Sequence, residues 1–97
     1  MLYLAFVKTR PEFAGKDLTG KSRAWWNEGD KPADMRVRGF YGTLSESPNV
    51  IVFEADGHDS IAAMLSYWPE VEFDIHPAQD LVEVFQGQGM KIESGGS

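Results

Sequence analysis

Two short segments of the sequence are apolar on both of the faces that a β-strand presents. Leu2–Lys8 carries apolar or aromatic residues on both faces as far as Val7, and Val50–Ala55 does so as far as Phe53. Successive side chains of a strand point to opposite faces of its sheet, so each segment predicts a central strand that is buried on both sides. A chain with two such strands needs a sheet that is covered on each face, and this requirement limits its possible folds more than any other feature.

Two other segments alternate as a strand does when only one of its faces is buried. In Val71–His76 the two faces carry different residue types: Val71, Phe73 and Ile75 against Glu72, Asp74 and His76. In Met35–Leu44 the expected faces are Met35, Val37 and Tyr41 against Arg36, Arg38 and Phe40. Gly39 and Gly42 within this segment suggest a bulge or the close approach of another group. We therefore expect two further strands.

Two segments show the apolar periodicity of helices. Residues 57–68 follow Asp56, which suits the N-cap, and carry the stripe Ile61, Met64, Leu65 and Trp68. Residues 17–28 carry the stripe Leu18, Ser22, Trp25 and Trp26. A shorter C-terminal helix is expected over Gln79–Gln86, although Leu81–Phe85 also has the composition of a strand.

The expected elements follow one another in the order β-α-β-β-α-β, with the short helix after them. This is the ferredoxin-like order, in which a four-stranded antiparallel sheet carries both helices on one face. We therefore expect one α+β domain over residues 1–90 and a flexible tail over residues 91–97, in which Ser94–Ser97 has the composition of a linker. The second face of such a sheet has no helix to cover it.

The element order and the segment Tyr67–Pro77 (YWPEVEFDIHP) resemble small proteins of the dimeric α/β-barrel superfamily. The resemblance covers roughly residues 1–86 and rests on pattern, without a diagnostic motif. It implies that two sheets pack face to face into a barrel around a two-fold axis. The superfamily includes cofactor-independent monooxygenases, haem-degrading enzymes, isomerases, dehydratases and ligand sensors, so the resemblance leaves the activity open.

The composition supplies more large apolar side chains than a chain of 97 residues easily buries. Of these residues 42% are apolar and 12% are aromatic, whereas a domain of this size buries only roughly 60–65% of its unfolded surface. A subunit interface on the uncovered face of the sheet would bury the surplus. We therefore expect an obligate homodimer that buries more than about 2,000 Å² in total.

Charge is distributed unevenly along the chain. Residues 1–40 hold eight Lys and Arg against five Asp and Glu, whereas residues 41–97 hold one Lys against ten Asp and Glu. Opposite charges of this kind can pair between two copies of the chain. The net charge of −6 argues against nucleic-acid binding, which needs a basic surface.

The sequence contains no Cys, so it offers no disulfide, no thiolate metal site and no Cys nucleophile. Its first residues are apolar over only a short run and lack a preceding basic segment, so we expect no signal peptide. No stretch approaches the ~20 apolar residues of a membrane span. We therefore expect a cytoplasmic protein without membrane association.

His76 is the candidate catalytic residue. It shares a strand face with Glu72 and Asp74, and in a dimeric barrel that face is the interior or its rim, where a His can act as a general base or bind haem or a metal. The alternative is a partly exposed His that pairs with a neighbouring carboxylate. His58 is a weaker ligand-binding candidate, because a His in the first turn of a helix is usually solvated. The two His lack metal-ligand spacing, so we expect no metal site.

Five further residues are candidates for ligand contact: Trp25, Trp26, Arg36, Arg38 and Tyr41. Adjacent helical positions diverge by about 100°, so only one of Trp25 and Trp26 can point into the core, and the other lies at an interface or a pocket. The two Arg can clamp an anionic ligand or pair with carboxylates within or between subunits, of which Glu54, Glu72 and Asp74 have the matching spacing. We favour the pairing.

The sequence lacks the common catalytic and nucleotide-binding motifs, among them G-x-S-x-G, G-x-x-x-x-G-K and H-E-x-x-H. Three functions stay open. The chain can be a homodimer that binds a small apolar or aromatic molecule, an enzyme of the monooxygenase or isomerase type that uses His76, or a purely structural accessory subunit. The sequence names no cofactor. An aromatic cavity into which His76 opens would favour the enzyme.

Overall fold

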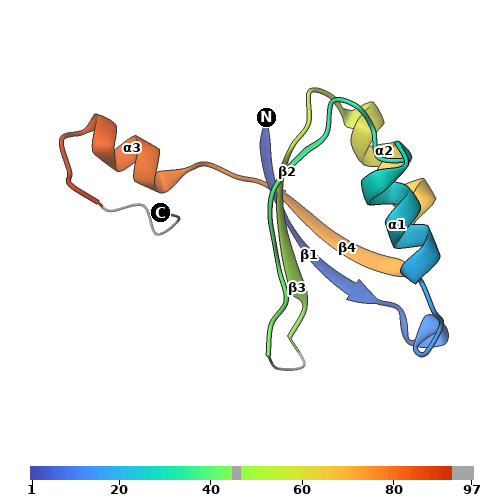
Figure 1. Cartoon of the computed structure of the whole chain (residues 1–97). Coiled ribbons are helices and arrows are strands. Elements are labelled where there is room, and N and C mark those ends of the chain that lie inside the picture. The colour runs from blue at the N-terminus through green and yellow to red at the C-terminus, as the bar shows by residue number, and fades with distance from the viewer. Residues whose placement is uncertain (45–46, 93–97) are drawn as a thin grey trace.

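The computed structural model of the chain describes residues 1–44 and 47–92 (Figure 1). Its elements in chain order are β1 (Leu2–Thr9), the 3-10 turn η1 (Pro11–Phe13), α1 (Thr19–Asn27), β2 (Arg36–Tyr41), β3 (Asn49–Glu54), α2 (His58–Tyr67), β4 (Val71–Pro77) and α3 (Leu81–Gly87). The expected α+β fold with a four-stranded antiparallel sheet is confirmed. From residue 93 onward, the tail expected over 91–97 lies outside the described residues.

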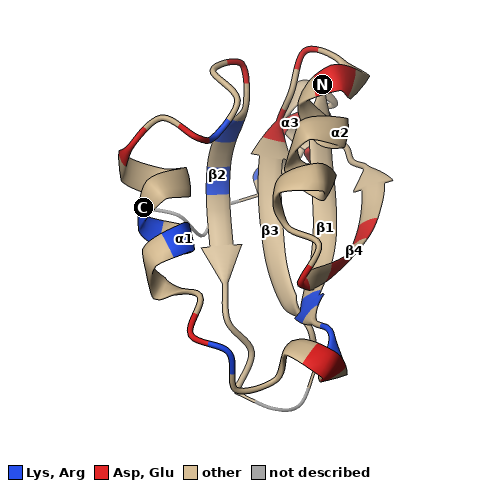
Figure 2. Cartoon of the chain, turned by 90° about the vertical axis from the view of Figure 1, so that its right-hand side faces the viewer, with Lys and Arg blue, Asp and Glu red and all other residues tan. Residues whose placement is uncertain are grey.

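The sheet has the strand order β2-β3-β1-β4, and all neighbouring strands are antiparallel. β1 and β3 are therefore the central strands, as their apolar composition predicts. Helices α1 and α2 lie on the same side of the sheet in Figure 1, and Figure 2 views the sheet from that side. The opposite side, which neither of these helices covers, is called the open face below.

The hydrophobic core lies between the sheet and helices α1 and α2. It takes alternate residues of β1 and β3 together with side chains of the helices and loops: Tyr3, Ala5, Val7, Trp25, Met35, Ile51, Phe53, Ala55, Met64 and Trp68. Within it, the rings of Tyr3 and Phe53 stack with their centroids 5.4 Å apart. Burying a large apolar side chain stabilises a fold by ~1.5–3 kcal/mol, so this layer holds the two helices on the sheet.

Helix α2 confirms only part of its predicted stripe. Met64 and Trp68 are buried, whereas Leu65 is 44% exposed, so its expected place in the core is wrong. Ser60 is buried instead, and Tyr67 packs against the core. Ile61 packs against the core as predicted, so the helix presents residues 60, 61, 64 and 67 to the sheet, and of the predicted stripe only Leu65 lies outside this arc.

A side chain from another segment contacts the buried Ser60 at the start of α2. The sequence predicts Asp56 as the N-cap of α2, but Gly57 occupies that position and has no side chain. Asp34, in the loop before β2, accepts hydrogen bonds from Ser60 Oγ and, at 3.2 Å, from the backbone N–H of Asp56. These bonds, the one from Ser60 most, hold the pKa of Asp34 below its ordinary value. A carboxylate at the start of a helix is also favoured by the helix dipole.

A β-bulge in β2 reverses the expected faces of its second half. The register with β3 shifts between Val37 and Gly39, so that Phe40 pairs with Ile51 on the helix side and Tyr41 pairs with Val50 on the open face. The sequence predicts the opposite placement for Phe40 and Tyr41, because the extra residue of a bulge changes the alternation downstream.

Gly39 lies at this bulge, beneath the ring of Tyr41. A Cβ atom added there would lie 2.6 Å from the ring of Tyr41, which lies across the strand on the open face. The glycines of this segment thus mark the bulge, as the sequence suggests, but they do not reveal which residues change sides.

The open face has an apolar centre and charged edges. Its centre is formed by Leu4, Phe6, Val50 and Val52, which the helices leave uncovered. At one edge β2 carries Arg36 and Arg38, and at the other β4 carries Glu72 and Asp74, as the colouring of Figure 2 shows. The two edges of the sheet therefore have opposite charge.

Candidate ligand-binding site

A cavity of about 210 Å³ lies on the helix side of the sheet. Its lining comes from α1, the end of α2 and all four strands. Its lining is mainly apolar and aromatic: Val7, Lys8, Thr9, Leu18, Ser22, Trp26, Phe40, Asn49, Ile51, Trp68, Val71 and Phe73. Concave, mostly apolar sites with a few polar groups are typical of small-molecule binding.

Two aromatic side chains form the rim of this cavity. Trp26 from α1 stacks on Phe40 from β2, with ring centroids 6.1 Å apart and planes inclined by 28°. Trp26 is 41% exposed and Phe40 is 52% exposed, so both rings present area to solvent. The placement of Phe40 follows from the bulge in β2, and that of Trp26 from its position next to the buried Trp25.

The two adjacent tryptophans thus have separate roles. Trp25 is buried in the core, where its ring lies 4.9 Å from that of Tyr67 and 6.1 Å from that of Trp68. Trp26 lies at the cavity. The prediction that only one of the two points into the core is confirmed, because neighbouring helical positions diverge by about 100°.

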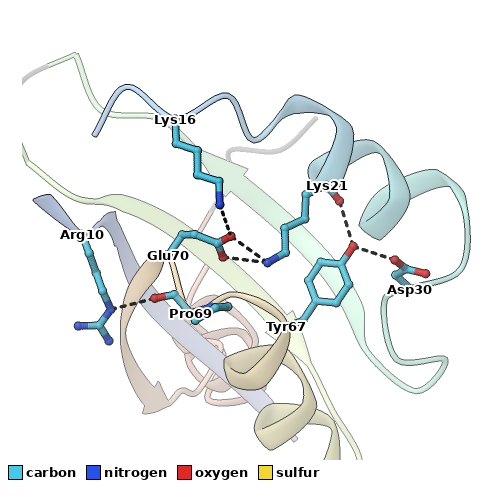
Figure 3. A network of polar contacts seen from close by, with 7 residues as sticks. All are labelled: Arg10, Lys16, Lys21, Asp30, Tyr67, Pro69 and Glu70. Carbon is cyan, nitrogen blue, oxygen red and sulfur yellow. Dashed lines mark hydrogen bonds and ion pairs between the residues drawn. The ribbon is translucent and has the colours of Figure 1, made fainter. Parts of the chain in front are cut away.

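A buried carboxylate holds the helix side of the site together (Figure 3). Glu70 is buried, and both of its carboxylate oxygens accept hydrogen bonds from Lys21 Nζ of α1, at 2.8 and 3.0 Å. Lys16 Nζ lies 3.7 Å from the same carboxylate. The Lys21 hydrogen bond lowers the pKa of Glu70 from its ordinary value. Since Glu70 follows α2 and Lys21 belongs to α1, the pair fixes one helix relative to the other.

Tyr67 adds a second connection between the same helices. Its hydroxyl lies 2.7 Å from Asp30 Oδ2 and 3.2 Å from the backbone carbonyl of Lys21 (Figure 3). Burial, and then the hydrogen bond to Asp30, raise the pKa of Tyr67 to about 12. Lys21 Nζ also stands 5.0 Å from the centre of the Tyr67 ring and 5.2 Å from that of Trp68. Because Trp68 lines the cavity, these contacts set the position of part of its wall.

The loop before α1 is tied to the same corner. The backbone N–H of Arg10 donates to the carbonyl of Glu70 at 2.8 Å, and Arg10 Nε donates to the carbonyl of Pro69 at 3.2 Å. Sequence patterns give no signal for these contacts, since Glu70 looks like an ordinary surface carboxylate after a Pro. Its partners come from a segment about fifty residues away.

His76 lies on the open face, away from the lining of this cavity. Its Nε2 lies 2.8 Å from Asp74 Oδ1, and its ring stands 6.3 Å from that of Phe6. The side chain is exposed in the single chain. It is thus placed as an exposed His that pairs with a carboxylate, the alternative that the sequence offers, and its role as a catalytic residue stays a prediction.

The other predicted candidates also lie outside the cavity. Arg38 pairs with Glu54 at 3.2 Å on the open face, Arg36 is exposed two residues earlier, and Tyr41 is 61% exposed. His58 is the first residue of α2 and is exposed. The structure therefore separates Trp26 from Arg36, Arg38, Tyr41 and His76, which share the open face.

A second hollow, of about 310 Å³, lies near the β4 edge and is lined by Phe6, Lys8, Pro48, Glu72, Phe73 and Asp74. Half of these residues are charged, so it suits an apolar molecule less well than the first cavity does. Within the described residues, no three His, Asp or Glu side chains come close enough together to hold a metal ion. The helices of residues 1–44 and 47–92 are all too short or too polar to cross a membrane.

Comparison with known proteins bears on the chain as a whole. A search of curated proteins finds no match. A family model does match, and it covers residues 1–89, which include every element from β1 to α3. The chain therefore belongs to the family described as "Domain of unknown function (DUF3303)".

Proposed function

We propose that this protein is a homodimer that binds one small, flat apolar or aromatic molecule in the cavity beneath α1 of each copy. The observation that carries the proposal is the half-exposed Trp26–Phe40 pair at the rim of the 210 Å³ cavity. Exposed aromatic rings beside an apolar hollow gain free energy when another flat ring covers them. Both rings sit on regular elements, which keeps the site formed without a ligand.

The size of the cavity limits its occupant. A dry apolar cavity of ~150 Å³ accommodates benzene, so about 210 Å³ suits a molecule of one or two rings. Lys8, Thr9, Ser22 and Asn49 are the polar residues of the lining. They favour a ligand with one polar substituent, because a polar group that enters an apolar site must keep a hydrogen-bond partner.

The homodimer is supported by the open face. Its apolar centre of Leu4, Phe6, Val50 and Val52 continues across the two central strands, and soluble monomers rarely leave such a surface uncovered. A second copy packed face to face would cover it and would form the barrel that the sequence resemblance implies. The occupant that fits best is a second copy because the two edges of the sheet complement each other in charge.

Charge also favours one orientation of the two copies. A two-fold axis parallel to the strands and between the two sheets places β2 of each copy opposite β4 of the other. The basic edge with Arg36 and Arg38 then faces the acidic edge with Glu72 and Asp74, and the strand register puts Arg36 level with the Pro77 end of β4. An axis perpendicular to the strands would instead place like charges opposite each other, which costs free energy. We therefore propose the parallel axis.

The dimer also bears on the enzymatic alternative. It would enclose the pair formed by His76 and Asp74, whose 2.8 Å contact is suited to general-base chemistry. Catalysis at His76 requires a substrate on the open face, whereas the aromatic cavity lies on the other side of the sheet. Binding in the aromatic cavity is therefore the function that we propose.

Ligand-observed NMR with indole and 1-naphthoate as probes tests the binding site. We expect saturable binding of at least one probe to the wild type, and at least tenfold weaker binding to Trp26→Ala. Leu65→Ala is the matched control, because Leu65 is a large exposed side chain of α2 outside the cavity. Equal losses in both variants, or no saturable binding to the wild type, would contradict the proposal.

A further inference from the structure

The C-terminal arm, defined here as residues 78–92, leaves the body of its own chain. The backbone N–H of Ala78 donates to the carbonyl of Leu2 at 2.9 Å. Among the described residues, all later hydrogen bonds of the arm stay within it, such as the one from Met90 N to the carbonyl of Phe85. No side chain of the arm belongs to the core or packs against it. Figure 1 shows α3 on the open-face side, separated from the sheet.

The dimensions of the chain reflect this arm. Its radius of gyration is 15.3 Å, whereas a compact domain of this length has about 12.5 Å. The longest axis is 48 Å and the shortest is 22 Å. The chain by itself therefore lacks a surface on which the arm is packed.

The arm nevertheless has the composition of a packed segment. On a helical wheel, Leu81, Val82, Val84 and Phe85 fall within one arc, opposite Glu83 and Gln86. Leu81 and Met90 are exposed. A helix of seven residues is unstable in water by itself, because isolated helices need ~12–15 residues to become even marginally stable. A second surface that covers this arc would stabilise it.

We propose that the arm of each copy packs along the β2 edge of the second copy, with its acidic first turn beside Arg36 and Arg38 of that copy. The proposal rests on the proposed homodimer and its axis. It adds that the two chains exchange their C-terminal arms and that the edge strand β2 is the surface that receives them.

The strand pairing places the start of the arm at the same end of the sheet as Arg36. Ala78 is bonded to Leu2, Leu2 pairs with Glu54, and Glu54 pairs with Arg36. The start of the arm and Arg36 thus lie at the same end of the sheet. A two-fold axis parallel to the strands keeps this level and places β4 opposite β2 of the second copy. The arm therefore begins close to Arg36 of the second copy.

Charge and exposed apolar surface at β2 both fit the arm. Asp80 is the N-cap residue of α3, and Glu83 lies in its first turn. Arg36 is exposed and has no ion-pair partner among the described residues. Farther along the edge, Phe40 and Tyr41 are exposed on the two sides of β2. They offer an apolar surface for Leu81 and Phe85, and an arm on Phe40 would also lie beside the rim of the cavity.

Disulfide cross-linking tests the arrangement, since the natural chain has no Cys. Two full-length chains with different tags are co-expressed, one with Arg36→Cys and one with Glu83→Cys. Mild oxidation is expected to link most of the mixed dimers through positions 36 and 83. In the control, Glu12→Cys replaces Arg36→Cys, because Glu12 lies in η1, which follows the opposite end of β1. We expect at least tenfold less cross-linking there.

Sedimentation of the same preparations separates the two proposals. A dimer with the specific link between positions 36 and 83 supports both the homodimer and the exchange of C-terminal arms. A dimer in which the link is absent, or no stronger than in the control, overturns the arm exchange and leaves the dimer standing. A monomer overturns both. If the link forms only within a chain that carries both substitutions, the arm packs on its own sheet and the exchange is wrong.

A second variant tests the apolar contact without a cross-link. Leu81→Ser with Phe85→Ser leaves the core unchanged, because neither residue packs against it. We expect the dissociation constant of the dimer to rise at least tenfold while the far-UV circular dichroism of the body is retained. An unchanged dissociation constant would overturn the exchange.

Discussion

Lys21 Nζ donates to both oxygens of the buried Glu70 carboxylate, at 2.8 and 3.0 Å, and in doing so links α1 to the start of β4. The same ammonium group stands over the rings of Tyr67 and Trp68. A single cation therefore connects the acidic group, the core aromatics and a wall residue of the cavity. The stability of this corner depends on the protonation of the groups that surround it.

Acid should weaken this corner. The folded pKa of Glu70 lies below its ordinary value of 4.5, so the contribution of the pair is present above that pH and is lost as the pH falls through the folded pKa. We expect the difference in free energy of unfolding between the wild type and Glu70→Gln to shrink as the pH is lowered from 7 to 3. Urea unfolding at several pH values measures it. A difference that stays constant over this range would argue against an ionised Glu70.

Alkaline pH should weaken the contact of the Tyr67 hydroxyl with Asp30 and the Lys21 carbonyl. The folded pKa of Tyr67 is raised from 10.0 to about 12, so its contribution is complete below pH 10 and is lost as the pH rises towards 12. Tyr67→Phe removes the ionisable group and should remove this part of the alkaline loss of stability. An absorbance titration of tyrosinate should likewise lose its component near pH 12. The prediction is wrong if Tyr67→Phe retains that component.

Of the two tryptophans that line the cavity, Trp68 should be the more costly to remove. It is 9% exposed and contacts Trp25 and Tyr67, so Trp68→Ala leaves a large void in the core. We expect a loss of about 3–5 kcal/mol in the free energy of unfolding. Trp26→Ala is the matched control, with an expected loss of about 1 kcal/mol or less, since Trp26 is 41% exposed. Denaturant unfolding of both variants measures the difference, and equal losses would show that Trp68 is not a core residue.

Local sequence patterns predict the strands and helices of this fold, but they do not predict which face some of their side chains occupy. Each strand and helix follows from alternation or helical periodicity, and the expected ends differ most at β2, which ends at Tyr41 rather than Leu44. The face of Phe40 depends on a bulge at one unspecified position. The buried Ser60 of α2 has its hydrogen-bond partner in Asp34, more than twenty residues earlier in the chain. Contacts of this kind depend on the tertiary structure, so neither alternation nor helical periodicity predicts them.

The candidate site shows the same limit. The adjacent Trp25 and Trp26 predict one core residue and one residue at a pocket or interface, and the structure assigns Trp26 to the cavity. The sequence does not predict its partner Phe40, which the bulge moves to the helix side. The candidates on the open face, His76 among them, are brought together by the strand pairing, and what they do depends on what covers that face.

The association state is the last prediction. The wild type should sediment at micromolar concentration as a dimer of the 10.8 kDa chain, with more than about 2,000 Å² buried in total, because the apolar centre of the open face needs a cover. Arg36→Glu with Arg38→Glu makes the β2 edge acidic where it faces the acidic β4 edge of the other copy, and should weaken the dimer. The effect should be largest at low salt, where screening is least.

Restoring complementarity provides the control for this change. Glu72→Arg with Asp74→Arg, added to the same chain, reverses the charge of both edges and should recover part of the affinity. The internal pair between Arg38 and Glu54 stays broken in this variant, so a loss caused by that pair alone would not be rescued. Sedimentation equilibrium at two salt concentrations distinguishes these results. A well-folded wild-type monomer would refute the dimer, and a dimer that the first double substitution leaves intact would refute its proposed axis.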